Sequence, residues 1–160
     1  NCILGFDTES IAKADWFPER KHLPDGPACI QLSTVDSTLI VHLARCGDGT
    51  ASSAPKILQE VLADPSIIKA GVGIDDDALE VYRWGKQQNG ADEQAWEIRS
   101  RFDLAAVAGG TAGRRMGLRQ LTSIVLNVDL PKSRKLAMSN WGARRLSDRQ
   151  VAYAARDAWA

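Results

Sequence analysis

Ile3-Leu4-Gly5-Phe6-Asp7-Thr8-Glu9 is an apolar run that ends in two carboxylates, and it predicts a buried strand that is central in its sheet. Successive side chains of a strand point to opposite faces, so Asp7 and Glu9 project from the same face. Two like charges at this spacing repel each other, and a shared proton, a basic neighbour or a bound cation has to offset the repulsion. Hard oxygen ligands of this kind suit Mg²⁺ or Mn²⁺. For these residues taken alone, a strand end with two solvated acids is the alternative.

The length and composition are those of one globular domain. The chain has 160 residues, of which 44% are hydrophobic and 25% charged, and this length is sufficient to bury a core. No apolar run approaches the ~20 residues of a membrane span, and no signal-peptide pattern opens the sequence. The sequence opens in a strand pattern and closes in a helical pattern. We therefore expect 1–160 to be a fragment that ends within its C-terminal helix, with further domains or partner proteins outside it.

The three cysteines show no metal-binding spacing and are odd in number. Cys2 and Cys29 lie in apolar, strand-like runs, and Cys46 lies in a polar connection. We expect buried, reduced thiols, which is the usual state of cysteine in an intracellular protein.

Charge is distributed unevenly along the chain, although the net charge is zero. Residues 1–110 hold 10 Lys+Arg and 17 Asp+Glu, a balance of −7, whereas residues 111–160 hold 10 and 3, a balance of +7. Such an asymmetry is typical of proteins with a polyanionic partner. A solvated basic face would give the same counts, so both interpretations stay open.

Strand patterns come first in the chain, and helix patterns are interleaved with strands later. The expected elements are strands over 1–7, 28–34, 38–43 and 67–73, helices over 55–62, from 75 onward, over 118–128 and over 148–160, a loop over 10–27 and a polar insert over 85–97. The short polar segment 35–37 suits a hairpin turn. Early paired strands followed by interleaved helices predict an α/β domain with a mixed central sheet and flanking helices.

Acidic residues recur at two later points of the chain. Asp77 lies in the first turn of the helix that begins at Asp75, where acids also serve as caps. Tyr153 and Asp157 are four residues apart on the final helix and therefore share a face. Four carboxylates and a tyrosine hydroxyl that converge on one point form the ligand set of a two-metal site for phosphoryl transfer, with ions ~3.5–4 Å apart. Each residue taken alone also fits a structural or surface role.

Three motifs, in this order, resemble those of the tyrosine branch of the DEDD exonuclease superfamily. They are Phe6-Asp7-Thr8-Glu9, Gly71-Val72-Gly73-Ile74-Asp75-Asp76-Asp77 and Tyr153-Ala154-Ala155-Arg156-Asp157. Between them, Leu118-Arg119-Gln120-Leu121, Lys132-Ser133, Ser139-Asn140-Trp141 and the segment 146–155 resemble ribonuclease D and Werner-type exonuclease domains. The likeness is closest to the exonuclease 3′–5′ domain-containing proteins of eukaryotes and spans residues 3–157.

The resemblance implies an RNase H-like fold and metal-dependent removal of nucleotides from the 3′ end of DNA or RNA, with two divalent cations, Mg²⁺ or Mn²⁺. Asp7 would bridge both ions, and Glu9 and Asp157 would complete the tighter site. Asp77 would act largely through water on the second ion, and Tyr153 would orient the nucleophilic water. The expected partner is a single-stranded or 3′-recessed nucleic acid. The alternatives are a catalytically inactive RNase H-like module that binds nucleic acid and a metal-dependent phosphatase of small substrates.

Residues around the motifs are expected to contact the substrate. This set comprises Thr8, Leu79, Lys132, Arg134, Lys135, Ser139, Asn140, Trp141 and Arg144. The basic members would bind phosphates, which gives affinity that depends on salt but not on sequence. Leu79 would help to wall the pocket for the terminal base. We expect Trp141 to be a packing anchor beneath the site, with a platform for base stacking as the alternative.

A few residues depart from the family pattern or lie near it. Ser10 stands where many relatives carry Trp, which leaves the lining of the base pocket open. Asp75 and Asp76 add charge beside Asp77 and could alter the metal preference. We expect Asp103, which is acidic and close to a motif-like segment, to be structural.

Overall fold

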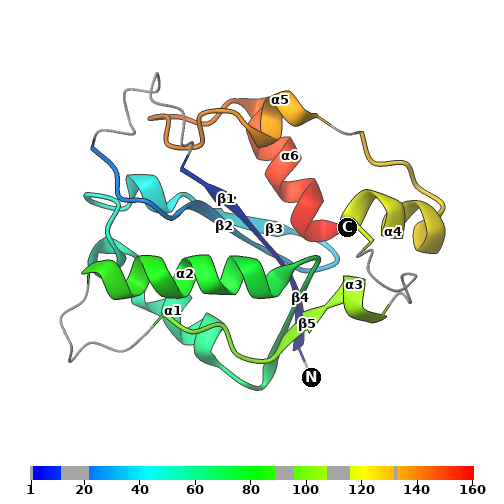
Figure 1. Cartoon of the computed structure of the whole chain (residues 1–160), viewed down its shortest axis with the longest axis horizontal. Helices are drawn as coiled ribbons and strands as arrows, with labels where there is room; N and C mark the ends of the chain where they lie inside the picture. Colours follow the sequence, from blue (N-terminus) through cyan, green and yellow to red (C-terminus); the bar gives the residue numbers. More distant parts are fainter. Residues whose placement is uncertain (1, 12–21, 89–95, 108–115, 132) are drawn as a thin grey trace.

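The computed structural model describes residues 2–11, 22–88, 96–107, 116–131 and 133–160. Its centre is a five-stranded sheet with the strand order β3-β2-β1-β4-β5 (Figure 1). The strands are β1 (Cys2–Ser10), β2 (Pro27–Ser33), β3 (Thr38–Val41), β4 (Ile67–Gly71) and β5 (Arg101–Asp103). β1, β2 and β3 pair antiparallel, whereas β1, β4 and β5 pair parallel. The predicted mixed sheet is confirmed.

The central strand is longer than predicted from the sequence. β1 continues to Ser10, because its ladder with β2 runs through Glu9, opposite Cys29, and closes at Ser10, opposite Pro27, with an irregularity between Glu9 and Ser10. Asp7 and Glu9 therefore lie within the strand and not at its end. The pairing with Gln31 and Cys29 of β2 therefore holds the backbone of both carboxylates, whereas the ladder with β4 ends at Gly5.

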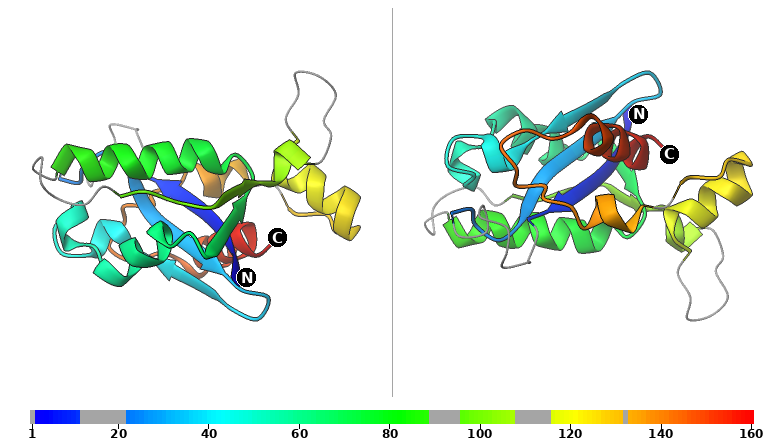
Figure 2. Two further views of the ribbon diagram at one scale, coloured as in Figure 1. Left: turned by 90° about the horizontal axis from the view of Figure 1, so that it is seen from below. Right: turned by 90° about the horizontal axis from the view of Figure 1, so that it is seen from above.

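Helices cover both faces of the sheet. One face carries Phe6, Ile30 and Leu32, and it packs against α1 (Lys56–Ala63) and α2 (Ile74–Gln88) in the larger core cluster. The other face carries Cys29 and packs against α6 (Asp148–Trp159) in the smaller cluster. Figure 2 shows α2 and α6 on opposite sides of the strands in both views. Because alternate residues of a strand face opposite ways, Asp7 and Glu9 face α6.

The predicted polar insert over 85–97 is wrong for its first part. α2 continues to Gln88, because Lys86 and Gln87 form the solvent face of a helix whose buried face carries Trp84. Trp84 and Trp96 are both buried, and their rings meet edge to face with centroids 5.1 Å apart. Residues 89–95 lie outside the described part of the chain.

The helix predicted over 118–128 is shorter and less buried than expected. Asn127 adopts a left-handed conformation, with φ of 53°, and ends α4 (Leu118–Leu126). Leu121 is buried, but Ile124 and Val125 are exposed, because α4 lies at the edge of the molecule away from the sheet (Figures 1 and 2).

The remaining short elements are η2 (Leu43–Arg45), η3 (Ala51–Ser53), α3 (Leu104–Val107) and α5 (Arg134–Ala137).

Two further expectations concern the cysteines and a membrane span. Cys2, Cys29 and Cys46 are free thiols, but only Cys29 is buried. The expectation of a buried thiol was wrong for Cys2, which lies at the start of β1 and is exposed. Among the described residues, no helix combines the length and the apolar character that crossing a membrane requires.

The position of α6 is fixed at both of its ends. Ser147 and Gln150 form a capping box at the N-terminus, and Gln150 Nε2 also donates to Ser139 Oγ at 3.0 Å. Near the C-terminus, α6 approaches β1 so closely that a Cβ atom on Gly5 would lie 1.9 Å from the carbonyl oxygen of Ala158. Gly5, which has no Cβ atom, therefore allows this contact. Its partner, Ala158, directly follows Asp157.

Gly5→Ala tests this close approach. The added methyl group has to displace α6, and overpacking of this kind costs about 1–3 kcal/mol, which lowers the melting temperature by roughly 2–12 °C. Gly117→Ala is the matched control, because a Cβ atom there meets nothing within 4 Å and the φ of −79° suits any residue. Equal melting temperatures of the two variants would contradict the contact.

Candidate active site

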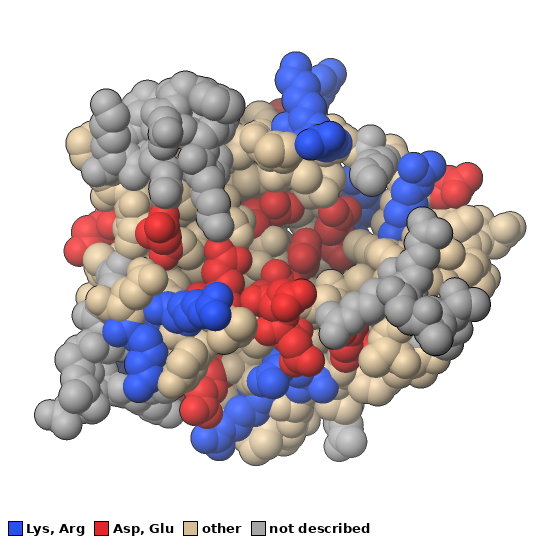
Figure 3. Space-filling model, in the orientation of Figure 1, with Lys and Arg blue, Asp and Glu red and all other residues tan. Residues whose placement is uncertain are grey.

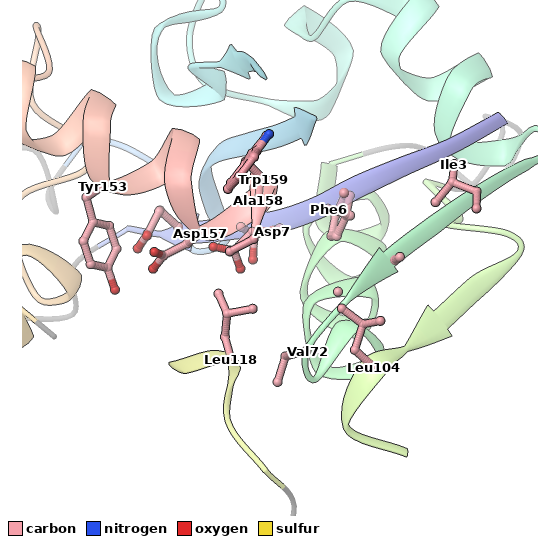
Figure 4. A pocket seen from close by; sticks show the side chains of 16 residues that line it. Ile3, Phe6, Asp7, Val72, Leu104, Leu118, Tyr153, Asp157, Ala158 and Trp159 are labelled. Atoms are coloured by element: carbon pink, nitrogen blue, oxygen red, sulfur yellow. The ribbon is translucent and has the colours of Figure 1, made fainter. Parts of the chain in front are cut away.

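A cavity of about 450 Å³ opens where β1, the end of β4 and the last turns of α6 meet (Figure 4). Its polar lining comes from Asp7, Thr8, Glu9, Tyr153 and Asp157. The metal site was predicted to consist of four carboxylates and one tyrosine. The structure brings four of these five residues, all except Asp77, into one cavity, although they lie at opposite ends of the sequence. Figure 4 shows the carboxylates of Asp7 and Asp157 close to each other, with Tyr153 one turn away along α6.

Tyr153 is held by contacts on both sides of its ring. Its hydroxyl group acts on the Asp157 carboxyl, whose pKa burial raises and the Tyr153 hydroxyl lowers. Its ring lies 6.1 Å from that of Trp141, centroid to centroid, and the guanidinium of Arg156 lies over it at 5.5 Å. The hydroxyl is therefore directed at the acidic end of the cavity by the spacing of four residues along α6.

Asp77 lies beside the cavity and does not line it. It is in the first turn of α2, and its Oδ1 accepts a hydrogen bond of 2.7 Å from Thr8 Oγ1, the residue between Asp7 and Glu9. Its negative charge acts on Asp7 and on Glu9, whose pKa values it raises. Asp77 thus interacts electrostatically with the carboxyl groups of the cavity, although Thr8 lies between it and the cavity.

The acidic groups of the site have raised pKa values because they are buried and because they repel one another. Burial, followed by repulsion from Asp77 and Asp157, raises the pKa of Asp7 to about 8. Burial and the charge of Asp7 raise the pKa of Glu9 to about 9. Burial also raises the pKa of Asp77 to about 6 and raises that of Asp157.

The chemistry of the donor set fits divalent cations. Among the described residues, no Lys, Arg or His lines the cavity, and Arg156 meets Asp157 from outside it, at 3.5 Å from Nε to Oδ1. Arg156 thus offsets part of the charge of Asp157, whereas for Asp7 and Glu9 a proton or a cation remains. No three His, Cys, Asp or Glu side chains of the described segments already form a cage for a metal ion, so binding would have to draw the carboxylates together.

The apolar wall of the cavity differs from the predicted one. Leu79 does not line it, and instead lies in a neighbouring groove with Asp75 and Tyr82. Val72, Leu104 and Leu118 supply the wall. Val72 and Leu118 stand in motif-like segments that could have indicated them, whereas Leu104 follows the short β5 and carries no sequence signal of its own. Ser10, also outside the cavity, donates to Glu80 Oε2 at 2.8 Å.

Three of the predicted substrate contacts have partners within the chain. Trp141 is 1% exposed, so it packs beneath Tyr153 and is not available for base stacking. Ser139 and the backbone carbonyl of Asn140 both accept hydrogen bonds from Gln150. Asp103 is structural as expected, because its Oδ1 accepts from the backbone N–H groups of Gly73, at 3.2 Å, and Ala105, at 2.9 Å.

The predicted phosphate-binding residues lie on the surface. Arg134, Lys135 and Arg144 are exposed, whereas Lys132 lies outside the described residues. Figure 3 shows acidic side chains gathered in the central hollow of this face, with Lys and Arg side chains toward its rim. This face thus has an acidic centre and a more basic periphery.

Comparisons with known proteins agree with this geometry. A family model described as 3′-5′ exonuclease matches residues 19–160. The human Exonuclease 3′-5′ domain-containing protein 2 is 37% identical over 115 residues, which are 71% of this chain and 17% of that protein. A 3′-5′ exonuclease of Arabidopsis thaliana is 28% identical over 164 residues, covering 99% of this chain and 49% of that protein. The chain thus spans half or less of the length of these relatives.

Solved structures show the same arrangement of strands and helices. One of them is RNase D of Escherichia coli, described as an exoribonuclease involved in structured RNA processing. It aligns with a TM-score of 0.65 and 25% identity, and the alignment covers 98% of this chain and 36% of the RNase D chain. NrnC of Brucella melitensis aligns with a TM-score of 0.66 at 21% identity, over 98% of this chain and 66% of its own, and shares the fold. The expected RNase H-like fold is confirmed, and, with the family model matching residues 19–160, the chain belongs to the 3′-5′ exonuclease family.

Proposed function

We propose that this chain is a metal-dependent exonuclease of the tyrosine branch of the DEDD superfamily, which hydrolyses phosphodiester bonds of DNA or RNA from the 3′ end. The observation that carries the proposal is the cavity in which Asp7, Glu9 and Asp157 meet the hydroxyl of Tyr153 with no basic side chain in the described lining. The family of the chain supports the class of reaction. We further propose an intracellular protein, in line with its three free thiols.

The proposed roles follow from where each side chain lies. Asp7, Glu9 and Asp157 would hold two divalent cations, Mg²⁺ or Mn²⁺, and Asp77 would act on the second ion from beside the cavity. Such ions, when bound, polarise the phosphate and lower the pKa of bound water. The contribution of the chain itself is position and charge. The Tyr153 hydroxyl, which lines the cavity together with Asp157, would orient the attacking water.

The shape of the cavity supports cleavage at a strand end. Its volume of about 450 Å³ lies within the ~300–1,000 Å³ typical of small-ligand sites, which suits one terminal nucleotide better than a duplex. The acidic side would face the phosphodiester, and Val72, Leu104 and Leu118 would face the terminal base. Exposed Arg134 and Lys135 would bind phosphates of the strand, which we propose to be single-stranded or 3′-recessed.

A cleavage assay tests the reaction. Single strands of DNA and of RNA, labelled at the 5′ or the 3′ end, are incubated with Mg²⁺, Mn²⁺ or EDTA. We expect 5′-labelled strands to shorten progressively and 3′ labels to be released first, only with metal. Asp7→Asn should abolish cleavage, whereas Asp148→Asn, which changes an exposed acid at the start of α6, should retain it. Retarded but uncleaved strands with every metal would support the inactive binding module instead.

Tyr153→Phe separates the hydroxyl from the aromatic ring. We expect the cleavage rate to fall about 100-fold, the scale of misplacing a reacting group, with the melting temperature nearly unchanged because the ring contact to Trp141 remains. Tyr82→Phe is the control, since Tyr82 lies in the neighbouring groove on α2. Full activity of Tyr153→Phe would refute the role of the hydroxyl.

A further inference from the structure

Gln31 is a buried amide that lacks hydrogen-bond partners. Its side chain is fully buried in the middle of β2, and neither its nitrogen nor its oxygen has a partner among the described residues. Buried polar side-chain atoms are hydrogen-bonded in the large majority of cases, and leaving one unpaired costs stability. If packing were the only role of this position, an apolar residue of similar size would serve it better.

The position of Gln31 in the sheet relates it to the active site. Gln31 lies directly opposite Asp7 in the antiparallel ladder of β1 and β2. Directly opposite residues project from the same face, with Cβ atoms about 4.5–5.5 Å apart. This is the face covered by α6, the helix that carries Asp157. The unpaired amide is thus in the layer between the sheet and α6, next to a residue of the proposed metal site.

Gln31 does not line the cavity. It therefore lies behind Asp7 and not in the space that a nucleotide would occupy. Ser33, the next residue of β2 on the same face, has a partner of its own, because its Oγ lies 2.7 Å from Thr38 Oγ1. On this face of β2, the unpaired amide is therefore a feature of the position opposite Asp7 and not of its neighbour Ser33.

We propose that Gln31 is a positioning residue, whose amide N–H donates a hydrogen bond to the Asp7 carboxylate when that carboxylate binds a divalent cation. This inference rests on the proposed function. A carboxylate that binds a metal is generally hydrogen-bonded by a further group, and loss of such a partner weakens metal affinity by about 10–100-fold. An amide suits this role because it donates a hydrogen bond without the positive charge with which Lys or Arg would compete against the cation.

The proposal separates stability from metal affinity. Gln31→Met removes both unpaired polar atoms at nearly constant volume, and replacement by an apolar group of the same shape is close to neutral or stabilising. We expect the melting temperature in EDTA to stay the same or rise, while the affinity for Mn²⁺ falls about 10–100-fold. If Gln31 only filled the core, Gln31→Met would change the melting temperature and the Mn²⁺ affinity in the same direction, or would leave the Mn²⁺ affinity unchanged.

Isothermal titration with Mn²⁺ and thermal denaturation in EDTA provide the test. Ser33→Ala is the matched control, because it removes a satisfied hydroxyl from the same buried layer. It should lower the melting temperature and keep the Mn²⁺ affinity of the wild type. Gln31→Leu repeats the measurement if Gln31→Met does not fold.

The outcomes distinguish the inference from the function on which it rests. If the wild type binds Mn²⁺ and Gln31→Met binds it with equal affinity, the role of Gln31 is refuted and the proposed function stands. A wild type that binds no Mn²⁺ overturns both. Weakened binding in Gln31→Met, with unchanged binding in Ser33→Ala, supports the hydrogen bond to Asp7.

Discussion

Mutual repulsion between carboxylates in a poorly solvated cavity is the constraint on which the rest of the structure depends. Burial and neighbouring charges raise the pKa of Asp7 to about 8 and that of Glu9 to about 9. Each of these groups would be more stable in water, and the fold holds them together at a cost in stability. Such groups are typical of functional sites, and a bound cation would take the place of the protons that otherwise keep them neutral. We infer that the site favours metal binding for this reason.

The scaffold keeps the carboxylates together by fixing two elements against each other. β1 pairs with β2 from Gly5 to Ser10, so Asp7 and Glu9 cannot move apart without breaking that ladder. α6 brings Asp157 to them, and it is held by the capping box at Ser147 and by the close approach at Gly5. Trp141, which was a possible base platform from the sequence, supports Tyr153 from below. The residues that surround the site thus act mainly by restricting its motion.

Sequence reasoning was most accurate where a residue's role depends on local spacing. The alternation of β1 and the i and i+4 spacing of Tyr153 and Asp157 both follow from periodicity, and the structure shows each of them. It was least accurate where the role depends on packing between distant segments. The exposure of α4, the burial of Trp96 and the absence of Leu79 from the cavity are set by neighbours that periodicity does not reveal. Gln31 was missed because only the register of β1 and β2 shows that it lies opposite Asp7.

The most direct test of this account is the melting temperature as a function of pH, measured from pH 5 to 9 in EDTA and in Mn²⁺. In the unfolded chain, Asp7 and Glu9 lose their protons near their ordinary pKa values of 3.8 and 4.5, whereas in the metal-free fold they keep them to about 8 and 9. The unfolded state is therefore favoured progressively as pH rises through this window, and stability in EDTA should fall. Mn²⁺ favours the charged carboxylates, so it should restore stability, most strongly near pH 8. Identical curves with and without Mn²⁺ would contradict the account.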